Sequence, residues 1–497
     1  MLFNSYQFMF AFLPAALAMF FLLGRFAGRD AAIGFLTLAS IFFYAWWSWI
    51  YILLILAEVA FSFLIGRQLE RTDLDDRQRR WILTGAIAII LVVLGYFKYA
   101  NFFLGIINDL SGTELTLGKI ILPLGISFHT FQQIAYLVDA YRRRAKHYRF
   151  MDFALFVTFF PQLVAGPIVH HNEAIPQIRQ PGFLKPRTIN LLVGVSLFGL
   201  GLFKKTVIAD TLAQVANPAF TSAAGGAHLT LVEAWMGALA YSLQLYFDFS
   251  GYSDMAIGLA RMFNVRFPAN FHSPYKAVNI ADFWRRWHMT LSRFLRDYLY
   301  IPMGGNRRGP ARQMLNLFLT MLLGGLWHGA GWTFIIWGAL HGLFLALQRL
   351  WSGIAKRQGI NLPRPVGWFI TMLCVMAAWV YFRADTIHTA HSVLASLAGL
   401  NGFGLKTPNL PDLPLDGWPV ILIAGLVATL APNSAEIFRR YAPTLKLVTL
   451  SYRRLGRWEE YLEWRPVALW ALAAGLVTTA GAVAILGWQS EFLYFQF

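Results

Sequence analysis

Two histidines, His328 and His341, lie within residues 314–349, a stretch whose apolar length suits a membrane helix. An ionisable side chain at bilayer depth costs roughly 2.5 kcal/mol or more, so such a residue is a candidate functional group. An imidazole titrates near neutrality and can act as a general base. For His328, the alternative is a hydrogen bond between helices that serves packing alone.

The sequence around His328 is rich in glycine. Gly325 and Gly329 are four residues apart, as are Gly338 and Gly342. Each pair puts a smooth patch on one helix face, where another backbone can approach closely. We therefore expect His328 to be a buried polar point in a tightly packed bundle.

His341 follows thirteen residues later, near Gln348 and Arg349. On a continuous helix, at 100° per residue, His328 and His341 point to different sides. They should share a site only if the glycine-rich stretch breaks the helix. We expect His328 to be required for chemistry, and His341 to reach the membrane interface and be dispensable.

A second polar centre occupies residues 282–300, DFWRRWHMTLSRFLRDYLY. At helical spacing, Trp284, His288 and Ser292 fall on one face, and Asp282 can pair with nearby arginines. Such a helix cannot cross lipid, so it should lie at the cytosolic interface or enter a protein-lined cavity. The alternative is an amphipathic interface helix with snorkelling arginines.

Seven arginines lie between residues 285 and 312. Together they would form an electropositive mouth suited to an anionic substrate such as a coenzyme A thioester. Neither GxxxxGK[ST] nor GxGxxG occurs, so nucleotide hydrolysis and dinucleotide binding have no support.

Three upstream segments, residues 122–144, 159–169 and 244–258, interrupt apolar runs with Pro or Gly and insert polar groups. These groups should face one another or a cavity. A catalytic pair of His129 and Asp139 is one interpretation and a structural polar network is the other, which we favour. The polar residues are His129, Gln132, Gln133, Asp139, Gln162, Asp248, Ser250 and Asp254.

Composition indicates an integral membrane protein. Of 497 residues, 57% are hydrophobic and 13% charged, against roughly 25% charged in soluble proteins; mean hydropathy is +0.51. The net charge is +17, and the basic residues lie in short loops between apolar runs. The positive-inside rule explains this pattern more simply than a nucleic-acid site does. The single cysteine, Cys374, excludes a disulfide framework and a cysteine-based metal site, and we expect no bound metal.

We expect an all-α polytopic protein with about eleven membrane spans. Residues 102–108, 120–141 and 251–263 look re-entrant or buried in protein, and 385–416 and 433–465 look like linkers or surface helices. The first apolar run reads as a retained span rather than a cleaved signal peptide. The expected spans are 7–24, 31–47, 49–66, 81–99, 151–169, 188–210, 231–249, 314–336 (or a broken span to 347), 366–382, 417–432 and 466–486.

The arginine-rich loops predict orientation. Residues 67–80, 142–149, 285–312 and 439–457 should face the cytosol. No gap between spans is long enough for a separate globular domain and no internal repeat is visible. We expect one membrane domain over 1–497, with its motifs in about 120–350.

The motifs resemble the membrane-bound O-acyltransferase family. The block FWRRWHMTLSRFLRDYLYIPMGGNRRG is followed by LWHGAGW, whose histidine lies forty residues after His288, and then by WGALHG. The segments FFPQLVAGPI, QLYFDFSGYSDMAIG, WVYFRA and the terminal FLYFQF resemble the branch that acetylates bacterial polysaccharides such as alginate. The resemblance covers nearly the whole chain. It implies a fold of many helices around a central tunnel joining the two membrane faces.

The resemblance also implies roles. The family's invariant membrane histidine maps onto His328, the expected general base, and His288 would position the thioester or stabilise the carbonyl oxyanion. Trp284, Arg285, Arg286, Ser292 and Trp327 are the expected donor-binding residues. The donor would be acetyl-CoA or a similar cytosolic acyl thioester, with no permanently bound cofactor.

The expected protein is a multi-pass O-acyltransferase of the bacterial inner membrane. It would pass acetyl towards the periplasm for O-acetylation of a polysaccharide such as alginate, through a periplasmic or membrane-anchored partner with a Ser-His-Asp-type site and alongside the exopolysaccharide export machinery. Within the family, D-alanyl transfer to teichoic acid and acetyl transfer to peptidoglycan or cellulose are the alternatives. From other classes, a transporter or channel and a scaffold for an export complex remain open.

Overall fold

The computed structural model describes residues 1–145, 147–404, 417–445, 462–487 and 493. In these ranges the regular elements are all helices, and no strand occurs. Six helical stretches are long and apolar enough to cross a membrane, and two shorter apolar helices, Gly417–Leu430 and Ala468–Ala484, add to them. The six stretches are Gln7–Phe26, Ile52–Leu69, Asp76–Ser111, Thr188–Ala224, Trp332–Gln358 and Arg364–Arg383. The all-α polytopic prediction is confirmed.

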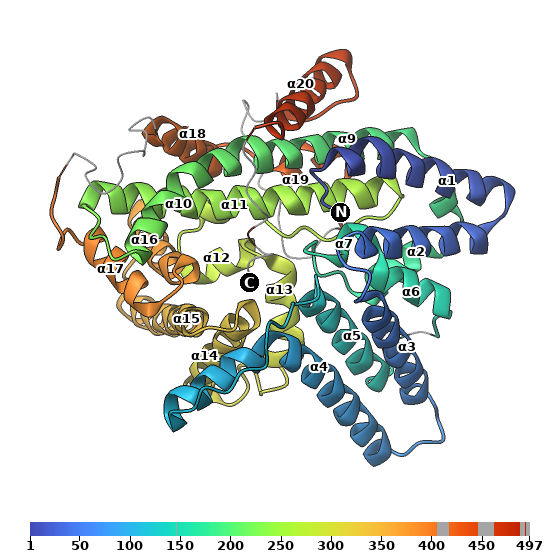
Figure 1. Cartoon of the computed structure of the whole chain (residues 1–497), viewed down its shortest axis with the longest axis horizontal. Coiled ribbons are helices and arrows are strands. Elements are labelled where there is room, and N and C mark those ends of the chain that lie inside the picture. Colours follow the sequence, from blue (N-terminus) through green and yellow to red (C-terminus); the bar gives the residue numbers. More distant parts are fainter. Residues whose placement is uncertain (146, 405–416, 446–461, 488–492, 494–497) are drawn as a thin grey trace.

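Most helices of the N-terminal third lie at one side of the molecule, while the later part of α4 reaches towards α14 (Figure 1). α4 begins at a capping box, in which Asp75 accepts from the Gln78 backbone and the Gln78 side chain accepts from the Asp75 backbone. It ends at Gly112 in the left-handed conformation. The elements are η1 Gln7–Phe12, α1 Leu13–Phe26, α2 Arg29–Ala45, α3 Ile52–Leu69, α4 Asp76–Ser111, α5 Ile126–Tyr141, α6 Phe150–Thr158, α7 Phe160–Leu163 and α8 His171–Ile178.

The central helix is α11, Leu231–Met262, which crosses the middle of Figure 1 with α9, Thr188–Phe203, and α10, Asp210–Ala224, along it. Glycines allow α9 and α11 to touch: a Cβ at Gly194 would lie 2.7 Å from the carbonyl oxygen of Gly258, and one at Gly201 would lie 2.5 Å from that of Gly251. Any larger residue at these positions would separate the helices.

The predicted glycine patches meet in a second helix pair. α14, Gly309–His328, and α15, Trp332–Gln358, fold back on one another. A Cβ at Gly338 would lie 2.5 Å from the carbonyl oxygen of Met321 and 3.1 Å from the Cα of Gly325. The close packing expected from the glycine spacing is thus present. It lies between α14 and α15, and not between one long span and a separate helix.

The remaining helices enclose the centre of the molecule. The short α12 and α13 lie between the central helix and the α14–α15 pair (Figure 1). They and their neighbours are η2 Pro181–Leu184, η3 Lys204–Ala209, η4 Pro274–Lys276, α12 Ile280–Arg286, α13 Met289–Leu295, η5 Arg296–Tyr300, α16 Arg364–Arg383, α17 Ile387–Leu397, α18 Gly417–Leu430, α19 Ser434–Ile437, η6 Arg439–Tyr441 and α20 Ala468–Ala484.

Residues 251–263 are buried in protein, as one of the two predicted alternatives held, but they continue α11 to Met262 and do not form a separate re-entrant segment. Two details of the predicted spans are wrong. Residues 102–108 continue α4 and are partly exposed. The span predicted over 151–169 stops at Thr158, where Phe159 is not helical and Pro161 begins the next short helix. Of the predicted linkers 385–416 and 433–465, residues 405–416 and 446–461 lie outside the described ranges.

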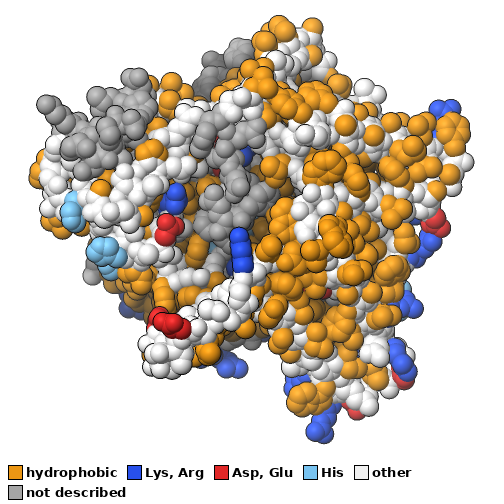
Figure 2. Space-filling model, viewed as in Figure 1, with side chains coloured by type: hydrophobic (Ala, Val, Ile, Leu, Met, Phe, Trp, Pro, Cys, Tyr) orange, Lys and Arg blue, Asp and Glu red, His pale blue; other side chains and the backbone are white. Residues whose placement is uncertain are grey.

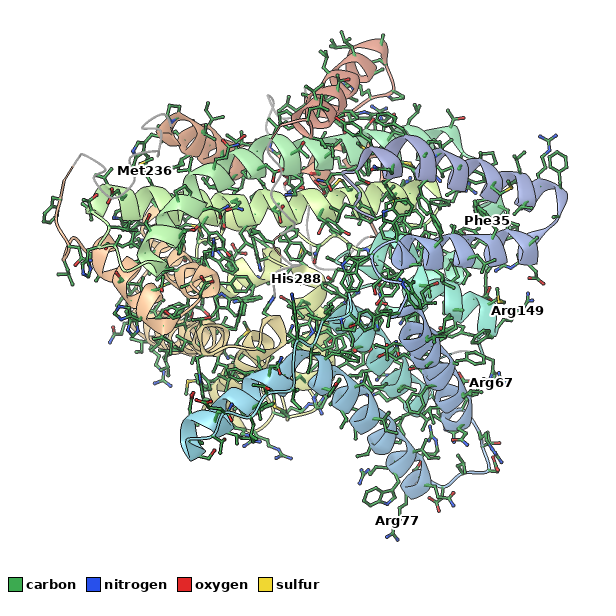
Figure 3. The ribbon with its side chains drawn as sticks, in the orientation of Figure 1. Phe35, Arg67, Arg77, Arg149, Met236 and His288 are labelled. Carbon is green, nitrogen blue, oxygen red and sulfur yellow. The ribbon has the colours of Figure 1, made fainter. Side chains whose placement is uncertain are left out.

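Hydrophobic side chains cover the face of the N-terminal helices seen in Figure 2, with Lys and Arg side chains at its rim. Several of these basic groups join neighbouring loops: Arg149 pairs with Asp30 at 2.9 Å and His147 with Glu70 at 2.7 Å. In Figure 3, Arg67, Arg77 and Arg149 lie along one outer edge. The starts of α2, α4 and α6 therefore lie at one end of the helix group.

A candidate acyl-transfer site at two buried histidines

His328 is the last residue of α14. The helix ends there because Gly329 and Gly331 are extended, with φ of −158° and −168°, and α15 starts at Trp332. The His328 side chain is buried among aromatic rings, with ring-centroid distances of 4.9 Å to Trp327 and 5.0 Å to Trp337. The predicted buried position of His328 is confirmed.

α4 holds the end of α14 through consecutive polar side chains. The Nζ of Lys98 donates to the carbonyl oxygen of His328 at 3.0 Å and also to that of Trp327. The hydroxyl of Tyr99 donates to the carbonyl of Leu326 at 2.7 Å. The last carbonyls of a helix lack partners within it and carry partial negative charge, so a lysine is suited to bind them. This contact fixes the backbone from which His328 projects.

His288 lies between α12 and α13 in the left-handed conformation, with φ of 41°. The expected single helix through Trp284, His288 and Ser292 is therefore wrong, because the chain turns at His288. The carbonyl of Asn270 holds the turn by accepting from the backbone N–H of Met289 at 2.9 Å. His288 is fully buried and occupies the middle of the molecule in Figure 3.

The turn brings His288 towards His328, since the two ring centroids lie 6.4 Å apart. Trp327 lies beside both rings, 6.3 Å from His288, and Phe249 meets His288 edge-on at 4.8 Å. The structure thus brings together two imidazoles forty residues apart in sequence, in a buried aromatic setting. Electrostatic interactions are strengthened in such surroundings.

The expected interfacial position of His341 is wrong. Its side chain is fully buried, and its Nδ1 accepts from the indole N–H of Trp284 at 3.2 Å. Trp337 lies between His341 and His328, with ring-centroid distances of 4.8 Å and 5.0 Å respectively. The break after His328 folds α15 back along α14, which carries His341 inward rather than towards solvent.

A cavity of 580 Å³, called here the histidine cavity, reaches His328. Trp46, Trp47 and the start of α5 form other parts of its wall. Lys98 is the one charged side chain among the described residues that line it.

A second cavity, of 590 Å³, is called here the arginine cavity. Its described lining includes three of the predicted donor-binding residues, Trp284, Arg285 and Ser292. Arg293, Arg296 and Met289, the residue after His288, complete the part of the wall that concerns the site.

Two predicted donor-binding residues lie elsewhere. Arg286 is absent from the described lining of the arginine cavity; it pairs with Asp282 at 3.0 Å and donates to the carbonyl of His272 at 3.3 Å. Trp327 lines the histidine cavity instead. Adjacent residues on a helix point in different directions, so helical geometry disfavours Arg285 and Arg286 both facing one cavity, but the sequence alone does not identify which of them does.

The two cavities lie towards opposite ends of α5. Ile126 and Ser127, at its first turn, line the histidine cavity. Near its last turn, Asp139 accepts from the hydroxyl of Tyr298 at 2.9 Å, two residues before Tyr300 of the arginine cavity. A 16-residue helix is about 24 Å long. The arginine cavity therefore lies towards the end of α5 that adjoins the basic loop 142–149.

The suggested pair of His129 and Asp139 does not form. His129 Nδ1 lies 2.8 Å from a carboxylate oxygen of Glu58, and Asp139 lies 3.1 Å from His171 Nε2. The other upstream groups also have structural partners, since Asp248 pairs with Lys205 at 3.0 Å and Asp254 with Lys204 at 2.7 Å. These contacts support the structural network favoured from the sequence.

The sequence pattern did not single out Lys98 or Asn270. Lys98 carried a usable signal, because it is a lone cation within the predicted span 81–99. Asn270 lies in a polar, proline-containing connection and gave no comparable signal. Among the described residues, no group of three or more His, Cys, Asp or Glu side chains could hold a metal ion.

Comparison with known proteins gives concordant matches. The family model described as the membrane-bound O-acyltransferase family matches residues 120–385. The chain is 44% identical to a peptidoglycan O-acetyltransferase of Helicobacter pylori, over 82% of this chain and 81% of the relative. It is 40% identical over the full length of both chains to a probable alginate O-acetylase, AlgI, of Pseudomonas putida. A teichoic acid D-alanyltransferase of Bacillus subtilis is 30% identical over 47% of this chain and 60% of the relative.

Proposed function

The chain belongs to the membrane-bound O-acyltransferase family, and we propose that it moves acetyl from a cytosolic thioester to an exported polysaccharide. The enzyme class and the multi-pass membrane fold follow from the family. Family membership also favours an enzyme over a transporter or a scaffold. The acetyl group, its cytosolic source and the polysaccharide acceptor are the proposed parts.

The observation that carries the proposal is the pair of neighbouring buried imidazoles, His288 and His328. His328 lines the histidine cavity, and Met289, next to His288, lines the arginine cavity. The 6.4 Å between the ring centroids leaves the two imidazoles close enough to act on the same reacting group. A donor entering from one side and an acceptor from the other would meet there.

The proposed chemistry is direct acyl transfer. The acceptor hydroxyl attacks the thioester carbonyl while His328 takes its proton, since an alcohol is a poor nucleophile until it is deprotonated. The new C–O bond forms, the C–S bond breaks, and the released thiolate takes up a proton. Placed beside the carbonyl, His288 would align the thioester or stabilise the developing oxyanion.

The arginine cavity is the proposed donor side. Arg285 is largely exposed there, and its pairing to Asp282 is long at 3.5 Å, so its guanidinium is available to an anionic donor. Arg296 lines the same cavity. Phosphates of acetyl-CoA would bind such arginines through charge-assisted hydrogen bonds, while the thioester arm extends past Trp284.

The whole chain, residues 1–497, acts in this proposal as one domain in the bacterial inner membrane. The alginate O-acetylase relatives support alginate or a similar exopolysaccharide as the final acceptor. A partner with a Ser-His-Asp-type site, in the periplasm or anchored to the membrane, would receive the acetyl group and modify the polymer next to its export machinery.

The test is acetyl transfer across a membrane by the purified protein. Proteoliposomes loaded with radiolabelled acetyl-CoA should deliver label to external polysaccharide when the partner acetyltransferase is supplied, and His328→Gln proteoliposomes should not. Equal labelling by the wild-type and His328→Gln proteins would contradict the assignment of His328. In cells, loss of the gene should remove O-acetyl groups from the exported polymer.

Peptidoglycan is the second candidate acceptor, because the Helicobacter pylori relative carries that activity in its name and shares 44% identity. The two acceptors are separated by measuring O-acetyl groups on purified peptidoglycan and on secreted polysaccharide from the same pair of strains. Loss confined to peptidoglycan would reassign the acceptor and leave the acyl-transfer site unchanged.

A further inference from the structure

We infer that Asn270 is a positioning residue that holds His288 with its proton on Nδ1, so that Nε2 of the neutral ring is a proton acceptor. This inference deepens the proposed function and rests on it for its kinetic consequences. Its structural content, the tautomer of His288, stands independently of the reaction.

Asn270 is buried and joined to the His288 turn through its backbone. Its carbonyl accepts from the N–H of Met289 at 2.9 Å, and two residues on, the N–H of His272 donates to the carbonyl of Arg286 at 2.9 Å. These two bonds fix the segment of Asn270 against the segment of His288. The amide side chain is thereby held beside the imidazole.

The hydrogen bonds identify which end of the Asn270 amide faces His288. The backbone N–H of Thr290 can only donate, and it lies 3.4 Å from Asn270 Oδ1. The Thr290 hydroxyl accepts from the N–H of Ile168 at 3.0 Å, so its own proton is available for Asn270 Oδ1 at 2.8 Å. At the other end, Asn270 Nδ2 donates to the Ser253 hydroxyl at 3.2 Å. The carbonyl oxygen is therefore the end that meets His288.

His288 Nδ1 lies 3.1 Å from that oxygen. An amide oxygen can only accept, so Nδ1 must carry the hydrogen. In a neutral imidazole the other nitrogen, Nε2, then has a lone pair and no proton. The hydrogen bond made by one ring nitrogen commonly determines in this way whether the other nitrogen carries a proton.

The tautomer of His288 determines whether its Nε2 can donate a hydrogen bond to an oxyanion, one of the roles expected for this residue. Stabilising an oxyanion needs an N–H, and the neutral ring held by Asn270 has none at Nε2. The ring can instead accept, from His328, the proton that His328 takes from the acceptor hydroxyl, since the two ring centroids are 6.4 Å apart. Only the imidazolium formed in that step could then donate to the oxyanion. His288 is in this account a second proton acceptor, and Asn270 acts through it.

Kinetic tests use two substitutions of Asn270. Asn270→Leu keeps the shape but lets the ring change tautomer, so kcat should fall by roughly 10- to 100-fold with little change in KM for acetyl-CoA. Asn270→Asp restores an acceptor for Nδ1–H and should recover most of kcat. Its negative charge favours imidazolium and raises the pKa of His288, so the acid limb of the kcat profile should move to higher pH by about one unit.

Asn190→Leu and Asn190→Asp are the matched controls. Asn190 is also buried, but its amide donates to Asn264 rather than to a histidine. These variants should leave the acid limb in place and kcat per folded molecule within about twofold, as expected of substitutions outside the site. If Asn270→Asp is as inactive as Asn270→Leu and its acid limb is unmoved, the positioning role is overturned.

The tautomer itself can be read without activity. Solid-state NMR of the wild-type protein labelled with ¹⁵N-histidine, with His288→Gln used to assign the signals, should show a protonated Nδ1 and an unprotonated Nε2 for His288. A protonated Nε2 on the neutral ring would overturn the inference even if transfer is normal. Absence of acetyl transfer by the wild-type protein would instead contradict the proposed function and leave the tautomer result standing.

Discussion

The Nζ of Lys98 lies 3.0 Å from the carbonyl oxygen of His328, so a cation on α4 holds the backbone of the proposed base on α14. The same Nζ also binds the carbonyl of Trp327 and lies 5.8 Å from its ring centroid. The two residues are 230 positions apart in the chain. This contact makes the first membrane helices part of the site, although the proposed chemistry lies in the second half of the sequence.

Replacing Lys98 by Met should slow acetyl transfer. Methionine fills the space but cannot donate to the two carbonyls, and a charge-assisted hydrogen bond contributes roughly 1.5 to 3 kcal/mol. We expect kcat to fall on the order of tenfold or more, with KM for acetyl-CoA nearly unchanged because Lys98 lines the other cavity. Steady-state kinetics of the purified protein measure both constants.

Tyr99→Phe is the control for Lys98→Met. Its hydroxyl binds the carbonyl of Leu326, in the same turn of α14 but not at His328. Loss of this neutral hydrogen bond should cost roughly 0.5 to 1.5 kcal/mol of stability and leave kcat per folded molecule close to wild type. Equal losses of kcat in both variants would show that Lys98 acts through general stability of the helix end.

The fold class and the buried position of His328 could be predicted from the sequence, because the signals are local. Long apolar runs identify membrane helices, and a histidine inside such a run is costly enough to need a purpose. The glycine spacing around Gly325 and Gly338 correctly indicated close helix packing. These features depend on neighbours in the chain or on periodicity.

Other features depend on contacts between distant segments and could not be predicted. The turn at His288 and the inward position of His341 each depend on a partner from another segment, Asn270 and Trp284 respectively. The break after His328 differs, because it lies at Gly329 and Gly331, where the sequence had left a broken span open. Helical periodicity assumes an unbroken helix, and it failed where tertiary hydrogen bonds stabilise a turn instead. The pairing of Asp139 with His171 rather than His129 has the same origin.

Arg285→Gln should raise the KM for acetyl-CoA by about tenfold, the equivalent of one charge-assisted contact. Its guanidinium side chain is 68% exposed and reaches the arginine cavity. Arg286→Gln is the matched control, because its neighbouring guanidinium is 27% exposed and committed to Asp282 and the His272 carbonyl. It should lower stability and leave the KM unchanged. An unaltered KM in Arg285→Gln would show that these arginines do not bind the donor and act only in setting the orientation of the protein in the membrane.

The basic loops should be on the cytosolic side. In a Cys374→Ala background, single cysteines at the exposed positions 77 and 149 should resist a membrane-impermeant thiol reagent in intact spheroplasts. A cysteine at Lys119, in the connection between α4 and α5, should be labelled, because that connection lies at the opposite end of α4 from the 70–80 loop. Labelling of 77 and 149 but not 119 would reverse the orientation and with it the side from which the donor enters.

His328 and His341 offer the sharpest comparison, because both are buried and Trp337 lies between their rings. His328→Gln keeps hydrogen bonding but removes the base, so it should abolish acetyl transfer while the protein stays folded. His341→Gln can still accept from the Trp284 indole, as His341 Nδ1 does at 3.2 Å, and should retain most of kcat. His341→Ala should lose stability, since the Trp284 N–H is left buried without its acceptor, at a cost of about 1 to 3 kcal/mol. Its rate per folded molecule should still approach wild type. Activity in His328→Gln near the wild-type level, or its loss in a folded His341→Gln protein, would move the proposed base from His328 to another group in the site.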